Sequence, residues 1–99
     1  MSPKLAFANW EMNWARLVPR YYFDLKDSKG TAIDEDGTVL RDLDAAQNEA
    51  ARTLGGMAGD SVATVSGSGA EQMEIVVRDN DGAVMTVRFC FEISRKKVS

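Results

Sequence analysis

The stretch DLDAAQNEAARTLGGMA, residues 42–58, decides how this chain is expected to fold. Its apolar residues recur at spacings of three and four, the period of one face of a helix; they are Leu43, Ala46, Ala50, Leu54 and Met57 or Ala58. Most of these side chains are small, so the helix can lie close to a sheet. The sequence therefore predicts one main helix, with strands on either side of it in the chain packing against it.

The ends of this helix carry their own signals. Asp42 is expected to be the N-cap, because its carboxylate can accept a hydrogen bond from a free N–H of the first turn. In the alternative register Asp44 is the cap and Gln47 returns the bond, as in a capping box. The glycines at 55–56 each cost about 1 kcal/mol relative to alanine inside a helix. We expect the helix to stop at Gly59.

Two extended segments precede the helix. Residues 20–26 alternate, with Tyr21, Phe23 and Leu25 on one side, which is typical of a half-buried strand. A turn at 27–30 leads into a second arm, residues 31–40, which contains the acidic turn DEDG at 34–37. The pattern predicts a hairpin whose second arm bends or bulges near Gly37.

Two further strands are expected after a flexible connection at residues 60–70. Residues 71–78 form the third strand, residues 79–82 (DNDG) a hairpin turn, and residues 83–93 the fourth strand. A slip of one residue in the fourth strand would turn five large apolar side chains to solvent, so its register is strongly specified; they are Met85, Val87, Phe89, Phe91 and Ile93. The predicted fold class is α+β, a ββαββ antiparallel sheet with one helix packed on one face, in a single domain over residues 19–99.

Residues 1–18 form a separate N-terminal helical extension in this prediction. Phe7, Trp10, Trp14 and Leu17 recur in a heptad-like apolar stripe, and Pro19 ends the segment because it disfavours helical geometry at the preceding residue. Three interpretations stay open: the segment docks on its own domain or on a dimer mate, it is a mobile tail, or it binds a membrane or a foreign partner. Few basic residues lie on its polar side, which weakens the membrane interpretation.

Composition narrows the class of protein. Ninety-nine residues make one domain, and the formal net charge is −3. Residues 24–49 hold eight acidic and three basic side chains, a balance that argues against a nucleic-acid surface. The single cysteine, Cys90, suits a reducing compartment, and no run of about 18 apolar residues is present. We expect a cytoplasmic protein with no membrane and no nucleic-acid partner.

The residue types needed for several chemistries are missing. The chain has no histidine, which excludes Ser-His-Asp and Cys-His nucleophiles and histidine metal sites. The two Asp-x-Asp-Gly stretches resemble part of a calcium loop, but Ala32 and Leu43, or Val77 and Arg88, then occupy positions that require acidic ligands. We therefore expect no catalytic residue, no cofactor, no metal and no enzymatic activity. A pair of carboxylates for acid–base hydrolysis stays open, since such a pair depends on spacing in three dimensions.

Two smaller features have plain interpretations. The Ser66-Gly67-Ser68-Gly69 stretch leads into a strand, whereas a phosphate loop should lead into a helix. Cys90 lies on the polar side of its strand with no evident base nearby. It is expected to be a passive small residue, with a reactive thiol as the alternative.

Three segments together carry a resemblance to a known family: RYYFDL at 20–25, DEDG at 34–37 and LRDLDAA at 40–46. The chain resembles small bacterial proteins, common in rhizobia and related alphaproteobacteria, that are grouped as a domain of unknown function. The resemblance covers about residues 19–93. It implies no catalytic residue, because the family has no assigned activity. Family members begin near Pro19, so residues 1–18 are either a real extension or the product of an upstream start codon, with Met12 as a later start.

A fainter likeness is to HicB-type antitoxins. Those proteins also begin with a Tyr-containing strand, an acidic Gly-rich hairpin and an Ala-rich helix, in a partial double-stranded-RNA-binding fold. This chain lacks their usual Pro-Asp-Leu-Pro-Gly segment and any appended pair of DNA-binding helices. The likeness is architectural, and a fold does not determine a function.

The expected function is a non-enzymatic protein-interaction module that self-associates as a homo-oligomer. Exposed aromatic residues and two sheet edges that need covering motivate this hypothesis; the candidate contacts are Phe7, Trp10, Trp14 and Tyr22. The alternative is an antitoxin-like regulatory module that binds a small toxin or another protein through the acidic first hairpin, at Asp34, Glu35 and Asp36.

Overall fold

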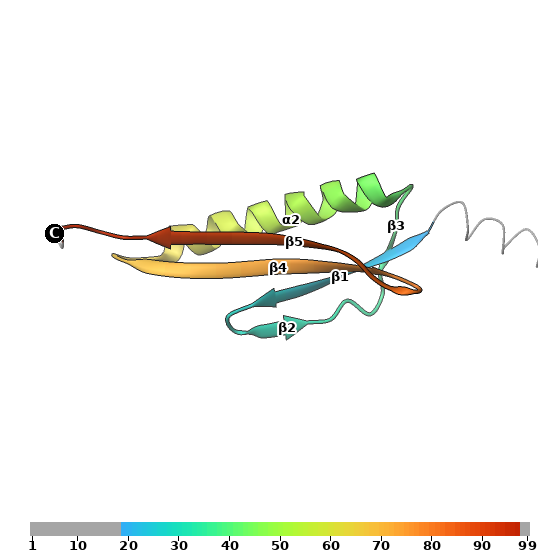
Figure 1. Ribbon diagram of the computed structural model, residues 1–99, viewed down its shortest axis with the longest axis horizontal. Helices are drawn as coiled ribbons and strands as arrows, with labels where there is room; N and C mark the ends of the chain where they lie inside the picture. Colours follow the sequence, from blue (N-terminus) through green and yellow to red (C-terminus); the bar gives the residue numbers. More distant parts are fainter. Residues whose placement is uncertain (1–18, 98–99) are drawn as a thin grey trace, which may run out of the picture.

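The computed structural model describes residues 19–97 and shows an antiparallel sheet with one helix across one face (Figure 1). The elements in chain order are β1 (Arg20–Asp27), β2 (Gly30–Ala32), β3 (Thr38–Val39), α2 (Leu43–Thr64), β4 (Gly69–Asp79) and β5 (Gly82–Ile93). The strand order across the sheet is β2-β1-β4-β5, and β3 pairs with β1. The predicted α+β class is confirmed. The N-terminal extension, with Phe7, Trp10 and Trp14, lies outside the described residues.

The helix begins where the sequence predicts. Asp42 is the N-cap, and its Oδ1 accepts a hydrogen bond from the backbone N–H of Ala45 at 2.9 Å. The prediction that the helix stops at Gly59 is wrong, since α2 continues to Thr64. The glycines lower the intrinsic preference for helix, but packing against β4 and β5 decides the outcome. Val62 in the added turn is half-buried, and its carbonyl accepts a bond from Val65 N–H.

The buried face of α2 is a row of residues four positions apart. Ala46, Ala50, Leu54 and Ala58 are all buried, and three of them are alanine, which lets the helix approach the sheet closely. Leu43 was expected on this face, and that prediction is wrong because its side chain is 45% exposed. It is the first residue of the helix, one position after the cap, and the row that meets the sheet starts at Ala46.

The core lies between α2 and the apolar side of the sheet. Met73, Ile75 and Val77 of β4 are buried beneath the helix, and Tyr21 of β1 completes this layer. In β5 the predicted register is confirmed: Met85, Val87 and Phe89 pack against the core, while Arg88 and Glu92 are exposed. The central strand β4 therefore supplies the largest fully buried side chains, Ile75 and Val77.

The second arm of the first hairpin is interrupted, as predicted. β2 and β3 both pair with β1, and residues 33–37 between them leave the sheet. Gly37 has φ 72°, a left-handed conformation that favours glycine. The interruption leaves an acidic loop held against β1.

The connection after α2 is shorter than predicted, covering 65–68 instead of 60–70. β4 already begins at Gly69, which pairs with Ile93. A Cβ at this position would lie 2.9 Å from Cγ1 of Val65. The absence of a side chain thus lets the end of the helix fold tightly onto the start of the strand.

Candidate functional site: a charged sheet face and an open edge

The face of the sheet opposite α2 carries a row of charged residues that crosses β1, β4 and β5. Lys26 of β1 is opposite Glu74 of β4, which is opposite Arg88 of β5. Nε and Nη2 of Arg88 donate to Oε2 of Glu74 at 3.0 and 2.9 Å. Such cross-strand pairs of opposite charge stabilise a sheet modestly.

Asp24 is the exception on this face because it is buried, with 5% of its surface exposed. Its carboxylate accepts two hydrogen bonds from Arg78, from Nε to Oδ2 at 2.6 Å and from Nη2 to Oδ1 at 3.2 Å. Its Oδ1 also accepts a hydrogen bond from the backbone N–H of Asp34 at 3.0 Å. The guanidinium carbon of Arg78 lies 4.8 Å from the ring centroid of Tyr22. A bidentate ion pair stacked on an aromatic ring is a geometry that arginine fits and lysine does not.

Asp34 organises the loop that covers this pair. Its Oδ2 accepts the backbone N–H of Phe23 at 3.1 Å. Its Oδ1 accepts the backbone N–H groups of Asp36 at 3.2 Å and Gly37 at 3.0 Å. Its own carbonyl accepts Nη2 of Arg78 at 2.9 Å. The buried Asp24, the half-buried Asp34 and Arg78 thus form one connected network, which we call the Asp24–Arg78–Asp34 network.

Both carboxylates in this network are held in the ionised form. The hydrogen bond from Arg78 lowers the pKa of Asp24, against the opposing effect of burial. The backbone N–H of Gly37 is the largest cause that lowers the pKa of Asp34, again against burial. Hydrogen bonds to a charged carboxylate favour that charged form. These acids are therefore permanent anions at neutral pH, not proton donors poised to act near it.

The predicted acidic cluster separates into two parts. Asp34 turns its carboxylate into the network, whereas Glu35 and Asp36 are exposed at the tip of the loop. Nη1 of Arg20 donates to the carbonyl of Asp36 at 2.9 Å, which ties the far side of the loop to β1. The loop therefore presents two acidic side chains on a backbone that is fixed at both ends.

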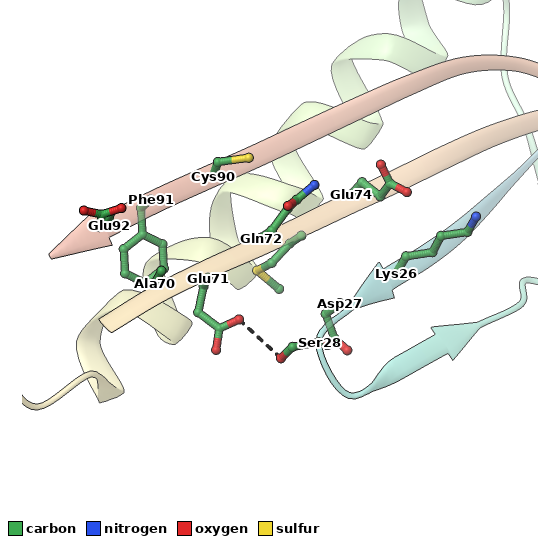
Figure 2. A pocket seen from close by; sticks show the side chains of 11 residues that line it. Lys26, Asp27, Ser28, Ala70, Glu71, Gln72, Glu74, Cys90, Phe91 and Glu92 are labelled. Carbon is green, nitrogen blue, oxygen red and sulfur yellow. Dashed lines mark hydrogen bonds between the residues drawn. The ribbon is translucent and has the colours of Figure 1, made fainter. Parts of the chain in front are cut away.

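An open depression of about 710 Å³ lies where β1 ends and β4 continues (Figure 2). Ser28 in the β1–β2 turn faces Glu71 across it, with Oγ donating to Oε2 at 3.4 Å. Gln72 of β4 and Cys90 of β5 belong to the same lining, and Cys90 is an exposed free thiol. Most of the residues that line it have polar side chains of mixed charge, and the depression is open to solvent, unlike the enclosed apolar pockets that small-molecule sites use.

The outer edge of β5 forms one side of the sheet. β5 is twelve residues long and pairs along one side with β4. Among residues 19–97, no strand pairs with its other side, and α2 packs against both β4 and β5. The pairing register between β4 and β5 shifts between Val77 and Arg78 of β4, which are opposite the beginning of β5. The remainder runs without interruption to Ile93.

Two further properties of the described part of the chain bear on function. No cluster of three or more histidine, cysteine, aspartate or glutamate side chains placed to hold a metal ion occurs between residues 19 and 97. Over the same residues, no helix combines the length and the apolar character needed to cross a bilayer.

Of the predicted contact residues, the structure places Tyr22 and Asp34 within or against the same network and leaves Glu35 and Asp36 at the loop tip. Sequence reasoning missed Asp24 and Arg78. The alternation in β1 puts Asp24 on the polar side, but its partner lies 54 positions away. No local signal in the sequence identifies that pairing.

The helix-covered antiparallel sheet and its buried charge network define a small α+β domain. Residues 20–90 match the family model described as Domain of unknown function (DUF6894), and the chain belongs to this family. The predicted resemblance to a family described as a domain of unknown function is confirmed. The match includes the whole Asp24–Arg78–Asp34 network and ends at Cys90, within β5. Neither a curated protein nor a solved structure matches the chain.

Proposed function

We propose that this protein is a non-enzymatic protein-interaction module whose main partner is a second copy of itself. The observation that carries the proposal is the open edge of β5. An edge strand presents a row of unpaired backbone N–H and C=O groups, which can pair with a strand of another chain. A twelve-residue edge is long for this position in a sheet.

This edge has few of the features that prevent pairing. Natural sheets commonly protect an edge with proline, lysine or a bulge. Residues 87–93 (VRFCFEI) contain no proline and no lysine, and the register shift is at the other end of the strand. Their two charged residues, Arg88 and Glu92, have opposite signs. The segment is therefore suited to pairing with another strand.

The charge network supports the non-enzymatic part of the proposal. Every fully buried side-chain nitrogen or oxygen in the described part of the chain has a hydrogen-bond partner. The ionised carboxylates of Asp24 and Asp34 are engaged with Arg78 and with backbone N–H groups. Their role in this arrangement is to hold the loop at 33–37 on β1.

Multi-angle light scattering over a range of concentrations tests the proposal. The mass should rise from one chain to two as the concentration increases, and a single-chain mass up to millimolar concentration would contradict self-association. The full-length variant with Trp10→Ala and Trp14→Ala separates the two candidate contact surfaces. If β5 carries the contact, this variant still dimerises. If the N-terminal aromatic residues carry it, dimerisation is lost.

A second candidate function is an antitoxin-like module that binds a small toxin or another protein through the acidic loop. The observation that favours it is the presentation of Glu35 and Asp36 on a loop fixed by Asp34 and Arg20. The hypothesis predicts an adjacent gene that encodes a small toxin. Calorimetric titration with that purified protein should show binding, and Glu35→Arg with Asp36→Arg should remove it. An isolated gene would count against this function.

A further inference from the structure

The C-terminal half of β5 has a near-palindromic sequence centred on Cys90. In VRFCFEI, residues 87–93, Phe89 and Phe91 flank the cysteine, Arg88 and Glu92 lie one step further out, and the aliphatic pair Val87 and Ile93 ends the segment. Residues at equal distances from Cys90 are thus either alike in apolar character or opposite in charge. Such a segment is complementary to itself when it is paired with its own copy in the antiparallel direction.

Register can be decided by considering each possible two-fold centre. Residues directly opposite each other in a sheet have their side chains on the same face. A two-fold axis perpendicular to the sheet must therefore place one residue of β5 directly opposite the same residue of the second copy, and we call that residue the centre. Centres at Arg88 or Glu92 place two like charges directly opposite each other, which is destabilising. Centres at Phe89 or Phe91 leave both charged residues without an opposite charge. The centre at Cys90 alone places Arg88 opposite Glu92 of the second copy, twice by symmetry.

The helix side of β5 is consistent with the same centre. Phe89, Phe91 and Ile93 are only half-buried in the single chain, and the two rings are 5.8 Å apart between centroids. With the axis at Cys90, Phe89 is opposite Phe91 of the second copy. A two-fold axis perpendicular to the sheet keeps both helices on the same face. The four phenylalanine rings then meet between the two helices and bury surface that one chain leaves exposed.

The polar side accommodates the pairing without breaking existing contacts. Arg88 already donates to Glu74 of its own chain through Nε and Nη2. A guanidinium carries five N–H donors, so Nη1 remains for Glu92 of the second copy. Glu92 and Cys90 are both exposed in the single chain.

From these observations we propose that two copies join their sheets through β5 in an antiparallel pairing centred on Cys90. The proposal rests on the proposed self-association and assigns its register. The dimer is one continuous sheet, with Arg88 of each copy paired to Glu92 of the other. The two Cys90 residues face each other as a directly opposite cross-strand pair, with Cα atoms about 4.5–5.5 Å apart.

Charge reversal tests the register. In Arg88→Glu alone, positions 88 and 92 are both acidic, and in Glu92→Arg alone both are basic. Each variant by itself should dimerise about tenfold or more weakly than the wild type, because two attractions become two repulsions. An equimolar mixture should form a heterodimer, since every cross-strand pair then joins opposite charges. The Arg88→Glu chain lacks the contact with Glu74 both when it is alone and when it is in the mixture. The difference in association between the single variant and the mixture therefore reports only on contacts between the two copies.

Matched controls reverse the same charges away from β5. Lys29→Glu and Glu35→Arg lie on exposed turns and should leave the dimerisation constant unchanged. Urea unfolding of all four variants checks that each remains folded. If the mixture is no better associated than its two components, the register is wrong.

Cys90 provides a second readout that needs no fold-altering change. Directly opposite Cα atoms lie within the range that a disulfide spans. In wild-type protein at a concentration where it is dimeric, diamide should oxidise the two Cys90 thiols to one disulfide, and the diamide takes up the two electrons and two protons. The product is a covalent dimer. Cys90→Ser should remain uncrosslinked. A dimer by light scattering that diamide does not crosslink would overturn the Cys90 centre and leave self-association intact. A monomer by light scattering would overturn both.

Discussion

The guanidinium of Arg78 lies against the carboxylate of Asp24, with 2.6 Å between Nε and Oδ2, although the two residues are 54 positions apart. The same guanidinium donates to the carbonyl of Asp34 and lies over the ring of Tyr22. One side chain of β4 thus fixes β1 and the acidic loop together. This contact makes the first hairpin, the central strand and the loop at 33–37 a single unit.

Removing Arg78 should therefore destabilise the fold strongly. Arg78→Ala leaves the buried Asp24 carboxylate without its cation and should cost on the order of 3 kcal/mol of unfolding free energy. Arg78→Lys keeps the charge but loses the bidentate geometry, so its cost should be intermediate. Urea unfolding measures both. Arg52→Ala removes an exposed helical pair with Glu49 and should cost no more than about 0.5 kcal/mol. Equal effects of Arg78→Ala and Arg52→Ala would contradict the role of the network.

The lowered pKa of Asp34 gives a defined pH dependence. A carboxyl whose pKa is lower in the folded state stabilises the fold above its unfolded pKa of about 3.8, and this contribution is lost as the pH falls from there through the folded pKa. Asp34→Asn removes the charge that three backbone N–H groups stabilise, and should cost about 1–3 kcal/mol at neutral pH. The difference in unfolding free energy between wild type and Asp34→Asn should shrink below about pH 4.

Urea unfolding of the wild type and Asp34→Asn at several pH values from neutral to about 3 measures this difference. Glu35→Gln is the matched control, because its side chain is exposed and its neutralisation should leave the same profile as the wild type. A constant difference between wild type and Asp34→Asn at all pH values would show that the charge of Asp34 does not matter.

Gly37 should be intolerant of any side chain. It has φ 72°, and a Cβ would lie 2.8 Å from Cε2 of Tyr22 and 2.9 Å from Cγ of Arg20. Gly37→Ala should therefore add steric overlap, about 1–3 kcal/mol, to a left-handed penalty of about 1–2 kcal/mol. Gly67 has φ 78° but no atom within 4 Å of the Cβ position, so Gly67→Ala should show the left-handed penalty alone. Thermal unfolding compares them, and equal losses would contradict the close approach of Tyr22.

The glycines inside α2 should be replaceable with a gain in stability. Gly55 and Gly56 are exposed, have ordinary helical conformation, and have open space at the Cβ position. Each substitution by alanine should raise the unfolding free energy by about 0.5–1 kcal/mol, because the unfolded chain loses freedom. Urea unfolding of each variant measures the gain. A loss would indicate that these positions contact something outside the described residues.

Much of the fold follows from local patterns in the sequence. Alternation in β4 and β5 and the four-residue row Ala46, Ala50, Leu54 and Ala58 specify which sides meet. Turn chemistry is also local: Asp27 Oδ1 accepts the backbone N–H groups of Lys29 and Gly30, and Asp42 caps the helix at the predicted position. These features depend on residues within a few positions of one another.

The features that sequence reasoning missed depend on contacts between distant segments. α2 extends past Gly59 because the sheet supports it there, and Asp24 is buried because Arg78 and the acidic loop reach it from elsewhere in the chain. The open edge of β5 is likewise a property of the strand order. A sequence with two expected sheet edges does not show which strand lies at each edge.

Amide hydrogen exchange as a function of protein concentration measures the edge pairing residue by residue. Within 87–93, the amides that point away from β4 should become protected as the concentration rises, while those of β2 at the opposite edge of the sheet should exchange at a constant rate. Exchange in β5 that is independent of concentration, in a sample that light scattering shows to be dimeric, would contradict the assignment of β5 as the surface between copies.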